Sequence, residues 1–381
     1  MLFSKPQSVL GIDLGAGGIK LVELKKEKNR PVLFTYGITS MRQDVHHLVK
    51  NDKTAEDLVK KNSEQIKKEI STAETLQESE VNKYAEVLKL VCQKSRTVAK
   101  QAIVSLPVSA VFHALVTLPI VKKEEFPGIL KAEVKKLLPR PLDEMALDYQ
   151  ILPTNPDKKN QQVVLINAVP KNLVALYTQI FRQAGLVLEA LEPESTALER
   201  SLIGRDTAVS MIIDLGAERT NFFIMDQAVP ITHHSIEAGG HRVGEILSRS
   251  LDLPEAVVDR LKIDLCHPES QKLVRDHLSR ERFVTLFNGL FDPILKEIEY
   301  SFELYLRQSG NENKRPEKVI LTGGIAVLPY LSEIIAEKFK LKCYVGDPWA
   351  RVVYQDSLKP LLNQIGPRMS VAIGLALRNM V

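Results

Sequence analysis

Two aspartates stand in identical surroundings in the two halves of the chain. Asp13 and Asp214 each lie in the pentapeptide Ile-Asp-Leu-Gly-Ala, at residues 12–16 and 213–217, which are 201 positions apart. The carboxylate of such an aspartate can hold a hydrated Mg²⁺, and the glycine leaves backbone N–H groups open to an anion. One copy alone is explained best as a hairpin turn. Two copies at matching places favour a paired site for phosphate and magnesium.

Strand-like segments surround both pentapeptides and must position the aspartates. Each copy has an apolar segment before the turn, a second one after it, and a third one farther along. Short apolar runs bounded by glycine, proline and charged residues are typical of buried strands. The repeat therefore predicts an α/β protein with two similar domains that face each other. The matching segments are 8–10, 18–23 and 31–38 in the first half, and 209–212, 220–225 and 229–235 in the second.

Two further stretches near the end of the chain are rich in small residues. Gly323 and Gly324 follow a predicted buried strand and precede an amphipathic helix, so a ligand could approach the backbone there. A double glycine at this place is common in α/β proteins and is weak evidence alone. Residues 370–377 contain Ala372, Gly374 and Ala376, which would allow close helix packing. A simple buried terminal helix explains them equally well.

Composition excludes several classes of protein. The 381 residues, 44% apolar and 26% charged, predict two to three domains and argue against a disordered, fibrous or disulfide-rich chain. A net charge of +4 and an aromatic content of 6% argue against a nucleic-acid-binding surface. The three cysteines form no metal or disulfide motif. Neither a signal peptide nor an apolar run of about 18 residues is present, which predicts a cytoplasmic protein without a membrane span.

The order of these motifs resembles the actin-like ATPase superfamily, which includes actin, Hsp70, sugar kinases and FtsA. Residues 12–20 and 213–221 resemble its two phosphate loops, and residues 320–326 resemble its adenosine motif. Residues 190–200 and 367–378 resemble the two helices that connect its domains. The resemblance implies the actin-like, ribonuclease H-like α/β fold, with two duplicated domains around a nucleotide cleft.

Within the superfamily, the chain resembles the PilM family of type IV pilus assembly proteins. Hsp70 and sugar kinases do not carry the middle block, and FtsA has only a distant cousin domain there. The resemblance implies a cytoplasmic ATP-binding scaffold at the inner face of the inner membrane. It would bind the N-terminal tail of a PilN-like membrane protein, and indirectly PilO and the pilus motor ATPases. The matching stretches are 9–15, 19–24, 130–139, 141–144, 147–152, 168–171, 185–186 and 192–200.

The resemblance also implies a set of site residues. Asp13 and Asp214 would hold Mg²⁺ through water, and Glu194 would orient the attacking water, with Glu192 as the runner-up. Lys20 would place a point charge on the phosphates, unless it is an ordinary strand-edge lysine. Asp259 and Lys262 would lie near ribose and adenine, unless they form a surface ion pair. The full set for ATP or ADP is Gly15, Ala16, Gly17, Gly18, Lys20, Gly216, Ala217, Thr220, Asn221, Gly239, Gly240, Asp259, Lys262, Gly323, Gly324 and Ile325.

Two departures from the family pattern bear on activity. Ala16 and Gly17 stand where relatives often carry serine hydroxyls, and Gly244 stands where threonine is usual. Lost hydroxyls weaken side-chain ligation of phosphate and metal, whereas backbone binding survives. We therefore expect nucleotide binding with weak or no ATPase activity.

Residues 98–190 predict a small α+β insert that receives the partner's tail. Strands are expected at 104–106, 112–118, 146–151 and 162–168, and helices at 126–138 and 172–184. Such a unit has open sheet edges suited to a peptide, although packing alone would also explain it. The first core would comprise 1–97, 191–208 and 356–381, the second 209–245 and 317–355, and a helical nucleotide-capping subdomain 246–316. The charged stretch 54–80 predicts one or two solvated helices without an assigned function.

Other functions remain open from sequence alone. One is an FtsA-like polymerising ATPase, which predicts a C-terminal amphipathic membrane helix that we do not find after Arg378. Others are an active ATPase or kinase, and the actin-like component of a type II secretion or competence system. A weak homodimer is also compatible with the sequence. A membrane would be reached only through the partner.

Overall fold

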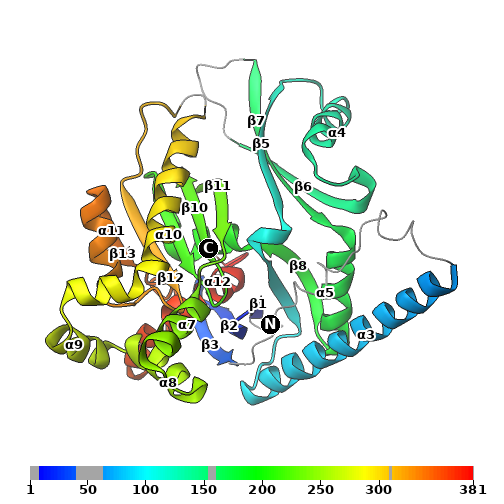
Figure 1. The fold of residues 1–381 in the computed structure, drawn as a ribbon. Coiled ribbons are helices and arrows are strands. Elements are labelled where there is room, and N and C mark those ends of the chain that lie inside the picture. The colour runs from blue at the N-terminus through cyan, green and yellow to red at the C-terminus, as the bar shows by residue number, and fades with distance from the viewer. Residues whose placement is uncertain (1–7, 40–62, 153–159, 309–310, 381) are drawn as a thin grey trace. The chain divides into compact units, whose positions relative to one another are not determined.

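The structure of the chain is a computed structural model that describes residues 8–39, 63–152, 160–308 and 311–380. They fall into two compact units. The first comprises residues 1–44, 90–108 and 189–381, and the second comprises 45–89 and 109–188. Each unit is described on its own below, and Figure 1 shows their elements. The boundaries of the four predicted subdomains stay a prediction.

Two five-stranded sheets with the same strand order form the first unit. The predicted duplication is confirmed, because in each sheet the first three strands form an antiparallel meander and the fourth pairs in parallel with the first. The first sheet has the order β3-β2-β1-β4-β8, and the second β11-β10-β9-β12-β13. The strands are β1 Ser8–Gly15, β2 Gly18–Glu27, β3 Arg30–Ile38, β4 Gln101–Leu106, β8 Val187–Pro193, β9 Ser210–Leu215, β10 Thr220–Asp226, β11 Val229–Ile236, β12 Lys318–Gly323 and β13 Lys342–Val345.

Strand alternation places the two aspartates over one shared core. Val9 of β1 and Ile212 of β9 lie in the same buried cluster, together with Ile103, Phe223 and other strand residues. Because side chains alternate along a strand, Asp13 and Asp214 continue these two inward-facing rows at the ends of their strands. The core therefore fixes the face on which both carboxylates lie.

Two helices fill the space beside this shared core. α6 (Glu194–Leu198) continues into a π-helical turn (Glu199–Ile203), and α12 spans Lys359–Ala376. α12 contacts strands of both sheets and also α6. The predicted bounds were wrong in both cases: residues 190–193 belong to β8, and α12 begins well before residue 367. Pro193 favours extended backbone in the residue before it, so the helix cannot begin earlier.

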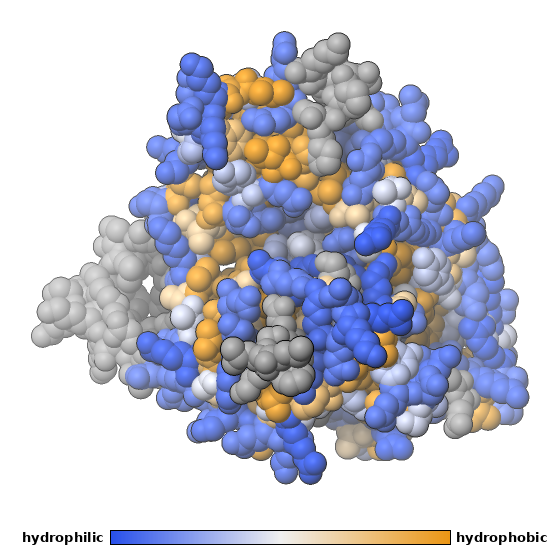
Figure 2. All heavy atoms as spheres, turned by 180° about the vertical axis from the view of Figure 1, so that it is seen from behind, coloured by the Kyte–Doolittle hydropathy of each residue, from blue (hydrophilic) through white to orange (hydrophobic). Residues whose placement is uncertain are grey.

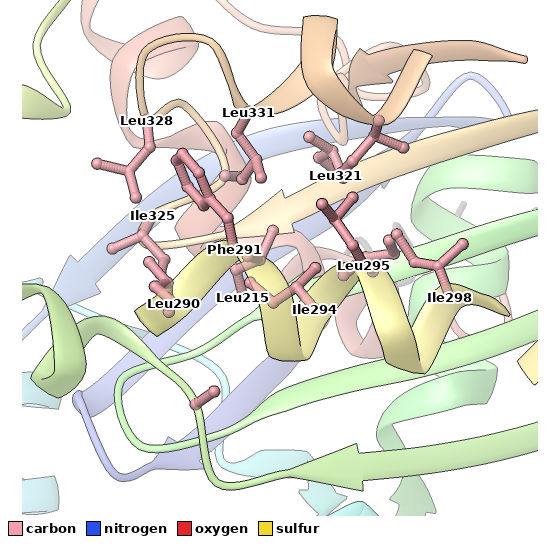
Figure 3. Packing of buried hydrophobic residues seen from close by; sticks show 14 of the residues in the cluster. Leu215, Leu290, Phe291, Ile294, Leu295, Ile298, Leu321, Ile325, Leu328 and Leu331 are labelled. Atoms are coloured by element: carbon pink, nitrogen blue, oxygen red, sulfur yellow. The ribbon is translucent and has the colours of Figure 1, made fainter. Parts of the chain in front are cut away.

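Five helices accompany the second sheet. α10 (Arg280–Leu306) packs its apolar side on the sheet, and Figure 3 shows Phe291, Ile294 and Leu295 of α10 beside Leu215 of β9 and Leu321 of β12. Leu215 follows Asp214 directly, so this second core holds the strand from its other face. The others are α7 Gly240–Leu251, α8 Glu255–Leu265, α9 Pro268–His277 and α11 Leu331–Phe339, with a short 3-10 turn at Asp356–Leu358.

The second unit contains a three-stranded antiparallel sheet of order β5-β7-β6. The predicted strands and helices of the insert are found there, except that the strand predicted at 104–106 is β4 and pairs with β1. α3 (Ser63–Lys94) covers the described part of the predicted charged helices, while residues 54–62 lie outside the described residues. The other elements are β5 Phe112–Pro119, α4 Phe126–Leu137, β6 Met145–Ile151, β7 Gln161–Pro170, α5 Lys171–Gln183, and 3-10 turns at Val108–Ala110 and Leu142–Glu144.

Within the described ranges, no helix combines the length and the apolarity needed to span a bilayer.

Candidate functional site

The aspartate of the first hairpin is held by two donors. Lys20 Nζ donates to Asp13 Oδ2 at 2.8 Å, and Ser105 Oγ of β4 donates to Asp13 Oδ1 at 2.9 Å. Asp13 and Lys20 are opposite each other in the β1–β2 register, and both side chains are largely buried. Lys20 is thus not an ordinary edge lysine, because β2 lies between β1 and β3. No local sequence pattern predicted Ser105.

The second hairpin repeats this arrangement with an amide in place of the lysine. Asn221 is opposite Asp214 in the β9–β10 register, as Lys20 is opposite Asp13. Asn221 Nδ2 donates to Glu194 Oε2 at 3.1 Å, and its side chain also bonds to Asp214. Glu194 is the first residue of α6 and accepts a hydrogen bond from the backbone N–H of Val108. The first residue of α6 therefore reaches the carboxylate of the second hairpin.

The three carboxylates of this cluster share one cation. Burial, and then the charge of Asp13, raises the pKa of Asp214 to about 6, against the lowering effect of Lys20. Burial, and then the charges of Asp13 and Asp214, raises the pKa of Glu194 well above its usual value. Three carboxylates therefore face the one ammonium group of Lys20, and burial together with their mutual repulsion favours the protonated forms of Asp214 and Glu194.

An excess of carboxylate charge fits a divalent cation. Both oxygens of Asp13 already accept hydrogen bonds, so a metal would be reached through its waters, as Mg²⁺ prefers. No group of three or more His, Cys, Asp or Glu side chains in the described residues forms a direct metal cage. The residues present therefore fit a hydrated Mg²⁺ between Asp13 and Asp214, which would neutralise phosphate charge.

The two predicted phosphate loops lie next to each other. A Cβ on Gly17 would stand 3.1 Å from the Cβ of Ala217. A Cβ on Gly15 would stand 2.8 Å from Lys20 Nζ and 3.6 Å from the Asp13 carboxylate. Glycine at residue 15 therefore leaves the ion pair its space, and the structure brings together the loops that the sequence placed 201 residues apart.

Part of the second predicted phosphate loop is engaged in hydrogen bonds within the protein. The Gly216 N–H donates to the Arg219 carbonyl at 2.9 Å, and the Gly240 N–H donates to the Gly216 carbonyl at 2.9 Å. The Thr220 hydroxyl is buried and donates to the Ala238 carbonyl. The first bond closes the loop internally, and the other two fix it against the segment that contains Ala238 and Gly240. The predicted nucleotide contacts of Gly216, Thr220, Gly239 and Gly240 stay a prediction.

The first residue of the double glycine, which ends β12, lies against the second aspartate. Gly323 has a φ of +94°, and a Cβ there would stand 2.6 Å from Asp214 Oδ1 and 2.4 Å from the Leu215 carbonyl. Ile325 beside it is buried. Only glycine fits this position, both in conformation and in space. The sequence prediction missed Arg368 of α12, whose Cγ lies 3.9 Å from a Cβ placed on Gly324.

Asp259 and Lys262 lie on the second helix after Gly239 and Gly240, and their place near ribose and adenine stays a prediction. The helix after Gly240 ends at Leu251, and both residues lie on α8. Lys262 Nζ is 3.5 Å from Asp259 Oδ1, which is the surface ion pair that the sequence left open as an alternative.

The structure separates the two candidate carboxylates of residues 192–194. Glu192 is largely buried and pairs with Arg200 and with Arg378, the latter at 2.9 Å, whereas Glu194 joins the aspartates. Arg200 also donates to the Gly374 carbonyl of α12. Glu192 therefore belongs to a structural ion-pair network between β8, the π-helical turn after α6, and the end of α12 with the residues that follow it.

We expect Glu192→Gln to lower the free energy of unfolding by about 3 kcal/mol, because it leaves two arginines without their carboxylate. Urea unfolding measures this. Glu189→Gln is the control, because Glu189 lies on the same strand and is exposed; it should change stability by less than about 0.5 kcal/mol. An equal loss in both variants would contradict the assignment.

Comparison with known proteins decides the family. The sequence profile of the family described as "Type IV pilus assembly protein PilM" matches residues 63–380. The chain belongs to the PilM family. The structure is similar to that of a PilM–PilN type IV pilus biogenesis complex, with a TM-score of 0.75, 22% identity, and coverage of 99% of this chain and 100% of that one. The expected actin-like ATPase fold and the expected family are both confirmed.

Two further proteins are similar to this PilM family member. Cell division protein FtsA of Borreliella burgdorferi is 26% identical over 183 residues, which cover 44% of this chain and 42% of FtsA. The chain thus spans less than half the length of that curated relative. The ethanolamine utilization protein EutJ of Carboxydothermus hydrogenoformans has 15% identity and a TM-score of 0.49, with coverage of 98% of this chain and 91% of EutJ.

Proposed function

We propose that this type IV pilus assembly protein is a nucleotide-binding scaffold that receives the cytoplasmic N-terminal tail of a PilN-like membrane protein. The observation that carries the nucleotide part is the meeting of Asp13, Asp214 and Glu194, with Lys20 and Asn221, at the ends of two duplicated hairpins. Such a cluster can hold ATP or ADP with Mg²⁺, because phosphate and metal supply the charges that balance it.

The chemistry that we propose at this site is binding with weak or no turnover. Lys20 would move from Asp13 towards the phosphates once a metal neutralises the aspartates. Glu194, held by Asn221, is the group that could orient a water. The loops supply no side-chain hydroxyl free for the phosphates, because residues 16 and 17 are Ala and Gly and the Thr220 hydroxyl is engaged.

Partner binding is proposed for the second unit. β6 pairs only with β7 among the strands that the structure describes there, so one of its edges is open to an added strand. Tyr149 and Ile151 lie on the same face of β6 and are 45% and 49% exposed. Figure 2 shows an apolar area at the top of the molecule, the end at which Figure 1 places β5 and β7. A PilN-like tail would bring the protein to the inner face of the inner membrane, with PilO and the motor ATPases reached indirectly.

A pull-down with a PilN-type N-terminal peptide, with and without Mg·ATP, tests the scaffold. We expect capture by the wild-type chain. Tyr149→Ser combined with Ile151→Ser should weaken it at least tenfold, because two exposed apolar contacts are lost from the β6 edge.

Leu273→Ser is the control, because Leu273 is 59% exposed on α9 of the first unit. It should leave peptide capture unchanged. No capture in either nucleotide condition would refute the scaffold, and equal capture by the β6 variant would refute the β6 edge.

A further inference from the structure

The net positive charge of the chain is concentrated at one end of the first sheet. Residues 25–30 and 94–100 carry seven cations and one carboxylate, a net charge of +6. The whole chain has 51 cations and 47 carboxylates, so the remaining 44 cations and 46 carboxylates leave the rest of the chain at −2. We call residues 25–30 and 94–100 the basic end.

The sheet register brings the two segments to the same level. Lys25 of β2 pairs with Ser8 of β1, and Leu10 of β1 pairs with Ala102 of β4 in parallel. Lys100, two residues before Ala102, therefore stands level with Ser8, two strands away from Lys25. Because neighbouring strands are about 4.8 Å apart, the backbones of Lys25 and Lys100 lie about 10 Å apart across this end of the sheet.

Side-chain hydrogen bonds fix the second segment on the first. The carboxylate of Glu23 on β2 accepts the backbone N–H groups of Val98 and Ala99, at 2.9 and 3.1 Å. The Thr35 hydroxyl on β3 donates to the Ser95 carbonyl at 2.6 Å. The loop that carries Lys94, Arg96 and Lys100 is thus anchored beside the β2–β3 hairpin.

The cations of the basic end are available to a ligand. Lys28, Arg30, Lys94, Arg96 and Lys100 are all exposed. Lys28 also lies in the tight turn of the hairpin, where φ is 49°. Among the described residues, none of the seven cations forms an ion pair with a carboxylate; Lys25 instead lies over the ring of Phe34, 3.2 Å from its centroid. The nearby turn after Val353 adds one carboxylate, Asp356, and one cation, Lys359. The net charge of this region therefore stays positive.

Exposed apolar side chains lie among these cations. Leu90, Val98 and Phe34 are 51%, 55% and 41% exposed. The duplicated hairpin of the second half has no such character, because its turn is Gln227-Ala228 and its single charge, Asp226, is bound by Lys314 and Tyr305. The basic end is therefore particular to the first half and is not a consequence of the fold.

We infer that the basic end docks directly on an anionic membrane surface, beyond any attachment through a partner's tail. Cations near such a surface gain affinity from anionic head groups, and interspersed apolar side chains enter the interface. A nucleic acid is the poorer fit, since a single exposed aromatic ring offers no stacking platform. Docking here would set the orientation of the first sheet relative to the membrane.

Vesicle co-sedimentation of the full chain tests this, with no nucleotide or peptide present. One set of vesicles contains phosphatidylcholine alone. In the other set, about one lipid in three is the anionic phosphatidylglycerol. We expect binding only to the second kind, weakened by salt. Lys26→Gln, Lys28→Gln and Lys100→Gln together should lower the partition coefficient about 100-fold, since each cation near the surface contributes about fivefold.

The control removes the same charge elsewhere. Lys272→Gln, Lys340→Gln and Lys342→Gln are exposed positions of the second half, and this triple variant should bind vesicles nearly as the wild type does. Circular dichroism melting checks that both variants are folded. Equal binding to both vesicles, equal loss in both triple variants, or binding to polyglutamate or single-stranded DNA without binding to vesicles would each overturn the inference. Failure of peptide capture would not affect it.

Discussion

Replacing Gly374 by alanine should cost about 4 kcal/mol or more of stability, among the largest effects of any single substitution in this chain. Gly374 lies in α12 where it crosses α6, and a Cβ there would stand 1.8 Å from the Ala197 carbonyl oxygen and 2.5 Å from its carbon. Both atoms are backbone and buried, so no side chain can move aside. The helices must separate instead, and the shared core that contains Ala197 opens with them.

Helix propensity alone predicts the opposite sign, which makes the substitution a sharp test. Alanine is better than glycine inside a helix by about 1 kcal/mol. Gly128→Ala is the matched control, because Gly128 lies in α4 and a Cβ there meets nothing within 4 Å. We expect Gly128→Ala to be neutral or slightly stabilising, and Gly374→Ala to give insoluble protein or a large fall in the urea midpoint. A loss below about 1 kcal/mol for Gly374→Ala would show that the crossing is less tight than the structure has it.

The repeat made much of the site predictable. Asp13 and Asp214 share their pentapeptide, and the same offset of 201 residues relates Lys20 to Asn221. Each aspartate therefore lies opposite its partner, on the same face of its own hairpin. Small residues at 372–376 left close helix packing and a simple buried helix equally open, and the structure places Gly374 against the backbone of Ala197. These features were readable because each depends on local spacing within one strand or helix.

Residues brought in from elsewhere were not predictable. Ser105 reaches Asp13 from β4, whose place beside β1 depends on a parallel pairing that no local pattern encodes. Glu192 and Glu194 are two residues apart across a strand–helix boundary, and only their partners distinguish their roles. Glu192 pairs with two arginines, whereas Glu194 lies near two aspartates. The Thr220 hydroxyl follows the family spacing but bonds to the carbonyl of Ala238, which lies after β11. Long-range contacts thus decided what spacing alone left open.

Replacing Asp214 by asparagine should stabilise the nucleotide-free protein above pH 6 while removing the Mg²⁺-dependent part of ATP binding. The pKa of Asp214 rises from 3.8 to about 6 in the fold, chiefly through burial and then through Asp13. At pH values below 3.8 the carboxyl is protonated in both states and costs nothing. As pH rises through 6, the unfolded chain is already ionised and the folded chain must ionise a buried group.

The wild type therefore loses stability between about pH 4 and pH 6, and asparagine cannot ionise. About two pKa units correspond to roughly 3 kcal/mol, so Asp214→Asn should exceed the wild type by about 2 to 3 kcal/mol at pH 7.5 and by almost nothing at pH 4. Urea unfolding at several pH values measures this. Stability sacrificed at a cluster of like charges is the expected signature of a binding site.

Asp206→Asn provides a control of opposite sign. A hydrogen bond from Lys318, and then one from the Ala208 backbone, lowers the pKa of Asp206 in the fold. Its carboxylate therefore stabilises the fold above its unfolded pKa, and that contribution is lost as pH falls through the lower folded pKa. Asp206→Asn should be less stable than the wild type at pH 7.5 and should leave Mg·ATP binding unchanged. If Asp214→Asn instead destabilises the protein at pH 7.5, or differs from the wild type equally at every pH, then Asp214 is an ordinary structural carboxylate and the proposed nucleotide site loses its central group.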